Sequence, residues 1–132
     1  MKIHKKKTAP RYVRQEGITS YLLTSLRTAG ARNLCTTLVE IEPGGEQRVH
    51  SHPPEQVYYI LDGAGLVTVG KETEEIHSGE CVFIPSGTPH GIKNHTEETL
   101  RYFSAASPSF DEAELKEWWP LGGEPDSGDS PS

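Results

Sequence analysis

The sequence has little of what membrane proteins and disulfide-stabilised secreted proteins require. Its 132 residues include two cysteines, Cys35 and Cys81, which lie far apart in apolar segments, so we expect two buried thiols in a reducing compartment and no disulfide framework. No apolar run reaches the roughly 18 residues that cross a bilayer, and the N-terminus lacks the apolar core of a signal peptide. We therefore expect a cytoplasmic protein that has no membrane partner.

Hydrophobic residues are also scarce, at 33% of the chain, and the charged residues are unevenly distributed. Residues 1–16 carry six basic side chains and one acid, whereas residues 107–132 carry seven acids and one lysine. Three adjacent lysines on a protein of net charge −6 are too few to predict nucleic-acid binding, because the acidic body would repel phosphates. The pattern predicts a basic N-terminal arm (1–16), a folded domain (17–106), a C-terminal helix (107–121) and a disordered acidic tail (122–132).

The folded region consists of short β-forming segments separated by Gly and Pro turns. Their regular spacing is typical of an all-β sandwich or barrel with nine or ten strands. The expected strands are residues 18–24, 33–41, 47–52, 56–61, 66–69, 72–76, 81–84, 90–93 and 100–104.

Only one segment has the pattern of a helix. Ser109 and Glu112 have the spacing of a capping box, and Pro120 ends the segment. Its apolar residues include two adjacent tryptophans, Trp118 and Trp119, which we expect to pack over one end of the barrel or against a second subunit.

Three histidines and one glutamine form the candidate chemical site. His50 and His52 are two residues apart on an expected strand and so face the same side. Gln56 opens the next strand, and its amide oxygen is a neutral ligand. His90 follows a turn that contains two prolines and a glycine, from which a strand pair can return it across the sheet. Two histidines at this spacing are by themselves weak evidence for a metal site.

The glycines and prolines around these residues carry a stronger signal. Five residues separate Gly44 from His50, and six separate Gln56 from Gly63. In the second segment, five residues separate Gly79 from Pro85 and one separates Pro85 from Gly87. Two residues then separate Gly87 from His90, and three separate His90 from Asn94. Together they resemble the two motifs of the cupin family over residues 33–104. The resemblance implies an antiparallel jelly-roll barrel that holds one metal ion with His50, His52, Gln56 and His90.

The sequence departs from the family pattern at one ligand, because the family usually has Glu where Gln56 stands. Glu55 is one residue early and would point to the opposite face of the strand, so recruiting it would require a bulge. Gln56 is the better candidate. Some cupins use Gln at this position, including enzymes that linearise unsaturated uronates, and their His-x-His-x-x-x-Gln pattern is similar to residues 50–56.

A neutral ligand set has a chemical consequence. Three imidazoles and an amide leave the full charge on a divalent ion, which is then a stronger Lewis acid and favours an anionic ligand. Imidazole and carbonyl ligands suit Zn, Fe, Ni, Mn or Cu, and the sequence does not choose among these metals. Four protein ligands leave one or two positions open on a five- or six-coordinate ion.

Strand alternation assigns further residues to the same interior. It places Arg48 with His50 and His52, where its guanidinium is a candidate anchor for a substrate carboxylate, although an Arg paired with a surface acid is an equal alternative. It places Tyr58 with Gln56, either as a proton donor or as a packing residue. It also predicts that Ile92 lines the interior. The remaining histidines, His4, His77 and His95, are expected to be solvated.

These observations favour a metalloenzyme that acts on a small, oxygen-rich, anionic molecule by isomerase, lyase or dioxygenase chemistry. The alternative is a non-catalytic cupin that binds or senses a small molecule, and a scaffold without metal is the third and weakest reading. The outward apolar residues Val57, Tyr59 and Leu61 favour a homodimer. Because one fold hosts many activities, the resemblance does not fix the reaction.

Overall fold

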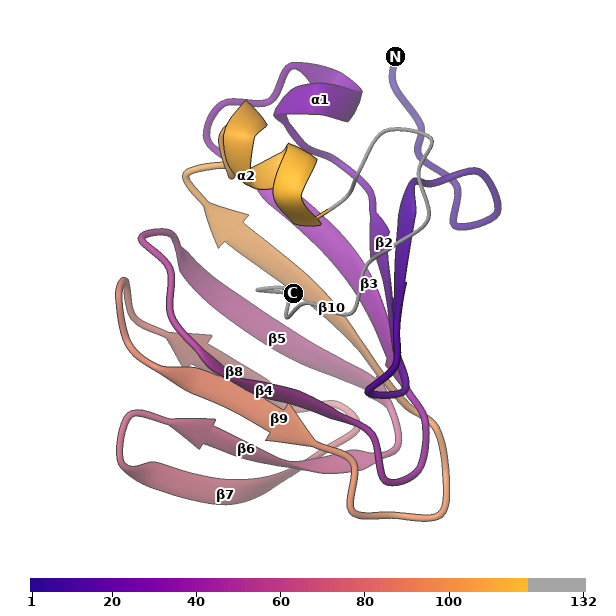
Figure 1. Ribbon diagram of the computed structural model, residues 1–132, viewed down its shortest axis with the longest axis vertical. Coiled ribbons are helices and arrows are strands. Elements are labelled where there is room, and N and C mark those ends of the chain that lie inside the picture. The colour runs from indigo at the N-terminus through magenta and orange to yellow at the C-terminus, as the bar shows by residue number, and fades with distance from the viewer. Residues whose placement is uncertain (119–132) are drawn as a thin grey trace.

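The computed structural model describes residues 1–118, which form a β-barrel of two antiparallel sheets (Figure 1). The six-stranded sheet is ordered β1 (Arg11–Arg14), β2 (Ile18–Leu22), β3 (Cys35–Ile41), β10 (Leu100–Ser107), β5 (Glu55–Asp62) and β8 (Cys81–Ile84). The four-stranded sheet is ordered β4 (Glu46–His50), β9 (His90–Lys93), β6 (Ala64–Val69) and β7 (Glu72–His77). The expected all-β cupin barrel is confirmed.

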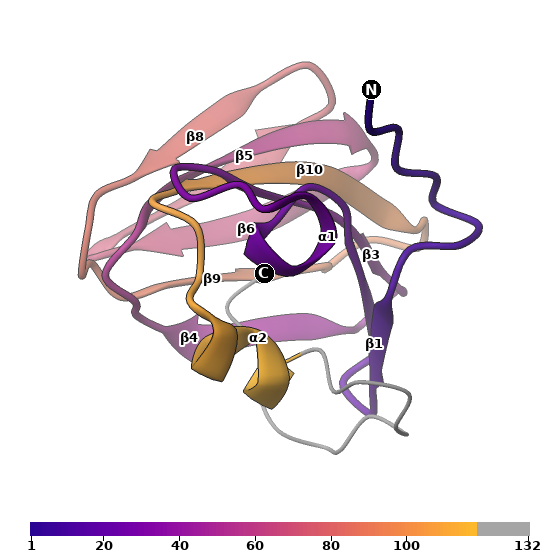
Figure 2. The same ribbon diagram turned by 90° about the horizontal axis from the view of Figure 1, so that it is seen from above.

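The main hydrophobic core lies between the two sheets. Figure 2 shows β5 and β10 on one side of the barrel and β4 and β9 on the other. Along β10, buried residues alternate with partly buried ones, as expected for a strand that turns one face to the core. The largest core side chains are Tyr58, Tyr102, Ile41, Ile60 and Leu100, all fully buried. The space between the sheets is therefore filled mainly by aliphatic and aromatic side chains.

The N-terminal segment contains a strand that the sequence analysis placed in a basic arm. Arg11–Arg14 pairs with β2, and its side chains alternate between exposed and buried. Tyr12 and Arg14 point into the barrel, at 2% and 4% exposure. The alternation is only four residues long and half of it is arginine, so charge concealed it in the sequence.

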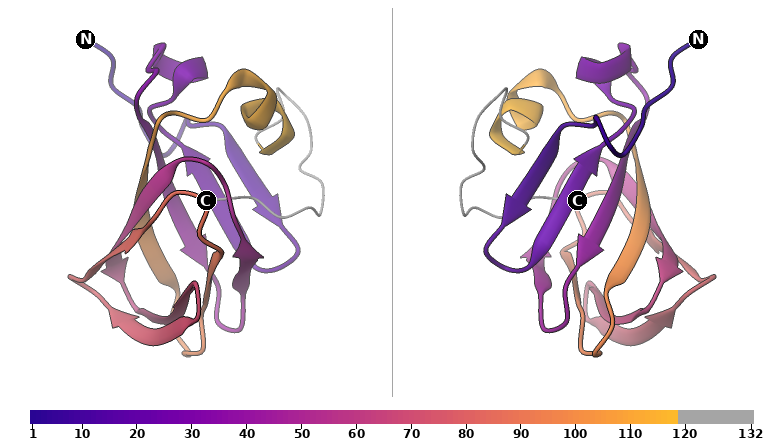
Figure 3. Two further views of the ribbon diagram at one scale, coloured as in Figure 1. Left: turned by 90° about the vertical axis from the view of Figure 1, so that its left-hand side faces the viewer. Right: turned by 90° about the vertical axis from the view of Figure 1, so that its right-hand side faces the viewer.

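Both helices lie at the same end of the barrel (Figure 3). The four-residue α1 (Leu26–Ala29) was not expected; Ser25 caps it by accepting from the Thr28 amide. The second helix, α2 (Glu112–Trp118), was expected, but its capping box differs. Asp111 and Glu114 exchange side-chain-to-backbone hydrogen bonds, whereas the Ser109 hydroxyl accepts from the Leu26 amide.

A second, smaller core joins this end to the sheet. It comprises Tyr12, Leu22, Cys35, Ala106, Phe110 and Leu115. Two expectations lie outside the described part of the chain. They are the packing of the Trp118 and Trp119 side chains and the disorder of the acidic tail. Within residues 1–118, no helix has both the length and the apolar character needed to cross a bilayer.

The two cysteines differ in their surroundings. Cys35 is buried as expected, and burial raises the pKa of its thiol to about 12. The expectation of a buried Cys81 is wrong, because Cys81 faces outward from β8, opposite Tyr59. The apolar run around Cys81 is a strand with one face in solvent.

Three donors converge on Glu40, on the outer face of β3. Lys6, Tyr21 and Arg101 donate to its carboxylate at 3.0, 2.9 and 2.8 Å. Burial opposes ionisation of Glu40, but these hydrogen bonds outweigh it and hold the pKa of the carboxyl below its usual value. Glu40 thus links the N-terminal segment to β2 and β10, the two neighbours of β3 in the six-stranded sheet.

We predict that Glu40→Gln lowers the free energy of unfolding by about 1 kcal/mol at neutral pH, because the charged network is lost. Since the folded-state pKa is depressed, this stabilisation is present above the ordinary Glu pKa and disappears as the pH falls through the folded-state value. Urea unfolding of both proteins at several pH values measures it. Glu72→Gln, at an exposed position on β7, is the control. A Glu40→Gln effect that persists unchanged in acid would contradict the prediction.

Candidate metal centre

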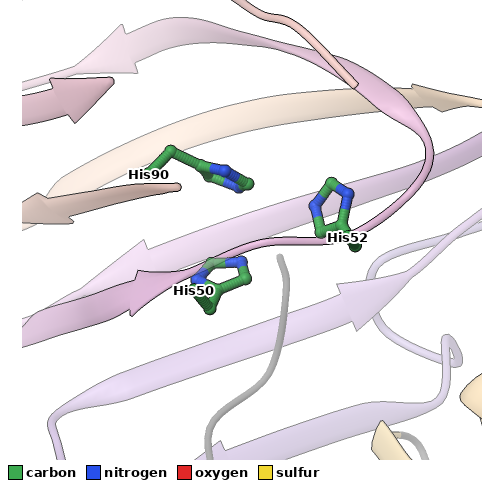
Figure 4. Close-up of side chains that lie close together, drawn as sticks. All are labelled: His50, His52 and His90. Carbon is green, nitrogen blue, oxygen red and sulfur yellow. The ribbon is translucent and has the colours of Figure 1, made fainter. Parts of the chain in front are cut away.

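Three imidazoles meet between the two sheets (Figure 4). His50 is the last residue of β4, His90 is the first residue of β9, and the two are directly paired across the strands. His52 lies in the loop after β4, not on the strand as expected. One ligand nitrogen from each ring lies within 4.8 Å of the other two. This geometry allows the three side chains to hold one metal ion.

Two glycines allow these segments to come together. A Cβ on Gly91 would lie 2.7 Å from the Gln47 carbonyl oxygen, so only glycine permits β9 to approach β4 this closely. Gly87 has a φ of +72° in the turn before β9, and its amide donates to the His52 carbonyl at 2.9 Å. The turn that precedes His90 is therefore bonded to the loop that carries His52.

Each imidazole has a backbone carbonyl beside its Nδ1 atom. His50 Nδ1 lies 2.9 Å from the Arg48 oxygen, His52 Nδ1 3.0 Å from the Pro54 oxygen, and His90 Nδ1 2.9 Å from the Thr88 oxygen. A carbonyl only accepts, so this contact favours a proton on Nδ1 and leaves the Nε2 lone pair for a metal.

His90 fits a metal ligand especially well. Its Nε2 is buried and has no hydrogen-bond partner among the described residues, which is costly unless a ligand satisfies the lone pair. Burial is the largest of the effects that lower the pKa of His90 to about 4; His50 and His52 lower it further, and the Thr88 hydrogen bond opposes the shift. The ring is therefore neutral near pH 7, which is the form that binds metals.

Gln56 lies beside His52 and supplies an oxygen to the same site. Its side chain is 2% exposed, with Oε1 2.9 Å from His52 Nε2 and Nε2 donating to the Ser104 hydroxyl. When His52 carries its proton on Nδ1, the Nε2 and Oε1 atoms are two acceptors in contact, which repel unless a cation lies between them. Glu55 is exposed on the other face of β5, in agreement with the expected strand alternation.

The placement of Arg48 beside the histidines is wrong. Gln47 pairs with Ile92 and His50 pairs with His90. Between these two pairs β4 advances by three residues and β9 by only two, so β4 contains a bulge. This bulge reverses the alternation and turns Arg48 outward. Its guanidinium pairs with the Glu16 carboxylate at 2.7 Å, which is the surface pairing that the sequence left as the alternative.

Tyr58 and Ile92 point into the barrel as expected. The Tyr58 ring centroid lies 6.0 Å from that of His90 and 4.4 Å from that of Tyr102. Burial, followed by the neighbouring Tyr102, raises the pKa of Tyr58 well above its ordinary value. Tyr58 is therefore a neutral phenol at the inner side of the histidine cluster, suited to donate a hydrogen bond and not to act as a base.

Sequence reasoning missed three residues next to the cluster. Gln47 contacts His50, Arg14 donates to Gln47, and the Phe110 ring lies edge-on to His52 with centroids 5.3 Å apart. The alternation of residues 11–14 could have predicted that Arg14 points inward. Gln47 could not be placed in this way, because the bulge in β4 interrupts the alternation between Gln47 and His50. Of the remaining histidines, His77 is exposed on β7 between Glu75 and Glu80, His95 contacts Glu75, and neither joins the cluster.

Comparison with known proteins agrees with this geometry. The family model of the cupin domain matches residues 37–106. The chain is 32% identical to the dimethylsulfoniopropionate lyase DddW of Ruegeria pomeroyi over 88 residues, which are 67% of this chain and 58% of DddW. It is 30% identical to an oxalate-binding protein of Thermotoga maritima over 67 residues, 50% of this chain and 55% of that protein. The chain thus spans little more than half the length of these two relatives.

A solved structure is also similar. The polyketide cyclase RemF from Streptomyces resistomycificus superposes with a TM-score of 0.70 and 28% sequence identity, covering 83% of this chain and 80% of RemF. The domain match includes β4, β9 and all four candidate ligands. With two antiparallel sheets closed around a buried histidine cluster, the chain belongs to the cupin family.

Proposed function

We propose that the protein is a metal-dependent enzyme that acts on a small, oxygen-rich, anionic molecule. His50, His52, Gln56 and His90 hold one divalent transition-metal ion in this proposal. The observation that carries it is the arrangement of the three imidazoles, whose Nδ1 atoms face carbonyl oxygens while one nitrogen of each ring lies within 4.8 Å of the others. The Gln56 oxygen, 2.9 Å from His52 Nε2, completes the ligand set.

The side chains around the cluster define what the site does. A bound divalent ion supplies Lewis-acid chemistry, polarising a carbonyl or carboxylate oxygen of the substrate. In this proposal Tyr58, whose ring lies against Tyr102 and beside His90, is the candidate hydrogen-bond donor to a substrate oxygen, although its buried hydroxyl also bonds to Tyr102 and must exchange that partner. Phe110 and the buried rings nearby reduce the access of water at His52. Neutral ligands leave the charge of the ion for an anionic substrate.

One relative supports lyase chemistry, because the similar DddW is a lyase. The similar RemF is a cyclase, which supports catalysis on an oxygen-rich molecule without choosing the reaction type. The oxalate-binding protein of Thermotoga maritima supports a second candidate, a cupin that binds a small dicarboxylate without turning it over. Both candidates use the same metal centre and differ only in whether a bond is broken.

We predict that the purified protein retains about one divalent ion per chain and that His52→Ala and His90→Ala lose it. Each substitution removes a neutral imidazole from the ligand set, and outer partners cannot replace it. Elemental analysis after dialysis measures the metal, and circular dichroism checks the fold. His77→Ala, which removes an exposed histidine of β7, should retain the metal. Stoichiometric metal in both cluster variants would remove this site from consideration.

We predict that Gln56→Glu keeps the metal but weakens the binding of anionic ligands by about tenfold or more, because the added carboxylate reduces the charge on the ion. Calorimetry with oxalate measures binding, and a turnover screen covers dimethylsulfoniopropionate, unsaturated uronates, diketones and flavonols. Arg48→Ala should leave both results unchanged, since Arg48 faces outward. Tight oxalate binding with no turnover of any compound would favour the binding module, and equal oxalate affinity in Gln56→Glu would contradict the electrostatic argument.

We also propose that the protein forms a homodimer through the outer face of the six-stranded sheet. Tyr59, Leu61 and Phe83 are exposed there, at 42%, 39% and 55%. Phe83 is paired with Val57, and Tyr59 is paired with Phe103 on the neighbouring strand β10. A groove lined in part by Leu34, Val57, Phe83 and Ala105 continues this apolar face. A second copy of the chain covers such a surface by matching it to itself.

The predicted consequence is that Phe83→Asp converts a dimer into a monomer, because a charge would be buried at the centre of the interface. Size-exclusion chromatography with light scattering measures the mass. Val49→Asp is the matched control, since Val49 is 59% exposed on the other sheet and should not affect assembly. A dimeric Phe83→Asp protein, or a monomeric native protein, would contradict the assignment.

A further inference from the structure

Two buried side chains stand behind His50, on the side away from the other imidazoles' shared centre. Arg14 of β1 is 4% exposed and Gln47 of β4 is 1% exposed. The Arg14 guanidinium donates to Gln47 Oε1 at 2.5 Å, and Gln47 Nε2 lies 3.2 Å from His50 Nδ1. A strand from the N-terminal segment is therefore connected to a metal ligand by one intervening amide.

The chemistry of arginine fixes how the Gln47 amide is oriented. A guanidinium has only donors, so the group facing it must be the Gln47 oxygen. The NH₂ group of Gln47 then faces His50 Nδ1. This NH₂ group can donate a hydrogen bond to Nδ1 but cannot accept one. Arg14 thus acts on His50 through Gln47, which makes it a positioning residue.

Within residues 1–118, two of the groups that contact His50 Nδ1 have opposite requirements. The Arg48 carbonyl, 2.9 Å away, requires a proton on Nδ1. The Gln47 amide requires a lone pair on Nδ1, which places the ring proton on Nε2 instead and takes that atom away from the metal. His90 differs, because its Nδ1 partner among the described residues is a carbonyl oxygen. His52 has an acceptor beside each ring nitrogen, the Pro54 carbonyl at Nδ1 and the Gln56 amide oxygen at Nε2.

We propose that the Arg14–Gln47 pair opposes the metal-binding tautomer of His50, so that His50 is the weak ligand of the cluster and Gln47 sets the metal affinity. The inference rests on the metal centre proposed above. Partners of metal-bound histidines ordinarily strengthen the site by accepting the Nδ1 proton. Gln47 does the reverse, and removing its amide should tighten metal binding, whereas a residue that merely supports the fold would weaken binding when lost.

The tautomers can be measured without any metal, by long-range ¹H–¹⁵N correlation spectra of the metal-free protein. We expect His90 with the proton on Nδ1, and His50 with a substantial population protonated on Nε2. His50 should shift to the Nδ1–H form in two variants. Gln47→Met removes the amide without changing the charge, and Arg14→Met allows the Gln47 amide to rotate so that its oxygen faces His50. Identical Nδ1–H tautomers for all three histidines in the native protein would overturn the proposal.

Zinc affinity, measured by competition with a chelating dye, provides the second readout. We expect Gln47→Met to bind Zn²⁺ about tenfold more tightly than the native protein. Gln47→Glu, whose carboxylate accepts from both Arg14 and His50, should bind more tightly still. Thr37→Val, a buried substitution of similar volume on β3, should leave the affinity and the tautomers unchanged. Weaker or equal zinc binding in both Gln47 variants would overturn the proposal.

The two readouts separate this inference from the proposed function. If the protein binds no zinc while the His50 tautomer still responds to Gln47, the metal centre fails and the control of His50 stands. If zinc binds but the tautomer does not respond, the metal centre stands and the control by Arg14 and Gln47 fails. Gln47→Glu preserves the shape of the side chain, so the test survives if Arg14→Met does not fold.

Discussion

The close pairing of β4 with β9 is the contact on which the site depends. Gly91 lets the β9 backbone lie against the Gln47 carbonyl, and this pairing sets His50 directly opposite His90. A side chain at position 91 would push the strands apart and separate the two imidazoles. The third imidazole follows from the same pairing, because the turn before β9 is bonded to the carbonyl of His52.

The sequence predicted the centre of the barrel well and its edges poorly, for physical reasons. The glycine and proline spacing predicted the turns, and the inward face of β5 followed from simple alternation, with Gln56 buried and Glu55 exposed. Arg48 was misplaced because the β4 bulge adds one residue and reverses alternation. Strand β1 was missed because pairing with β2 and burial against the second core, not composition, give Arg11–Arg14 its structure. A bulge leaves no local signal, and in β1 the arginines masked a short alternation that was present in the sequence.

The electrostatics of the interior follow from its composition. Among the described residues, the buried polar side chains are hydroxyls, amides, imidazoles and one arginine, with no carboxylate. Carboxylates remain outside, where Glu40 collects Lys6, Tyr21 and Arg101, and Glu16 pairs with Arg48. A cation held by imidazoles and an amide in this interior keeps its charge, since nothing in the ligand set neutralises it. The acidic net charge of the chain therefore says little about the sign of the potential at the site.

Two glutamines give the centre its character, and they act in opposite directions. Gln56 contributes an oxygen that contacts His52, and its neutrality makes the bound ion more electrophilic. Gln47 offers protons to His50 because Arg14 occupies its oxygen. A site built this way gains reactivity at the ion and gives up affinity for it. A carboxylate in place of Gln56 would bind the ion more firmly, and one in place of Gln47 would accept the Nδ1 proton of His50 and strengthen that ligand. Loose binding and a strong Lewis acid thus both follow from the absence of carboxylates among the buried side chains of the described residues, and Arg14 contributes by orienting the Gln47 amide toward His50.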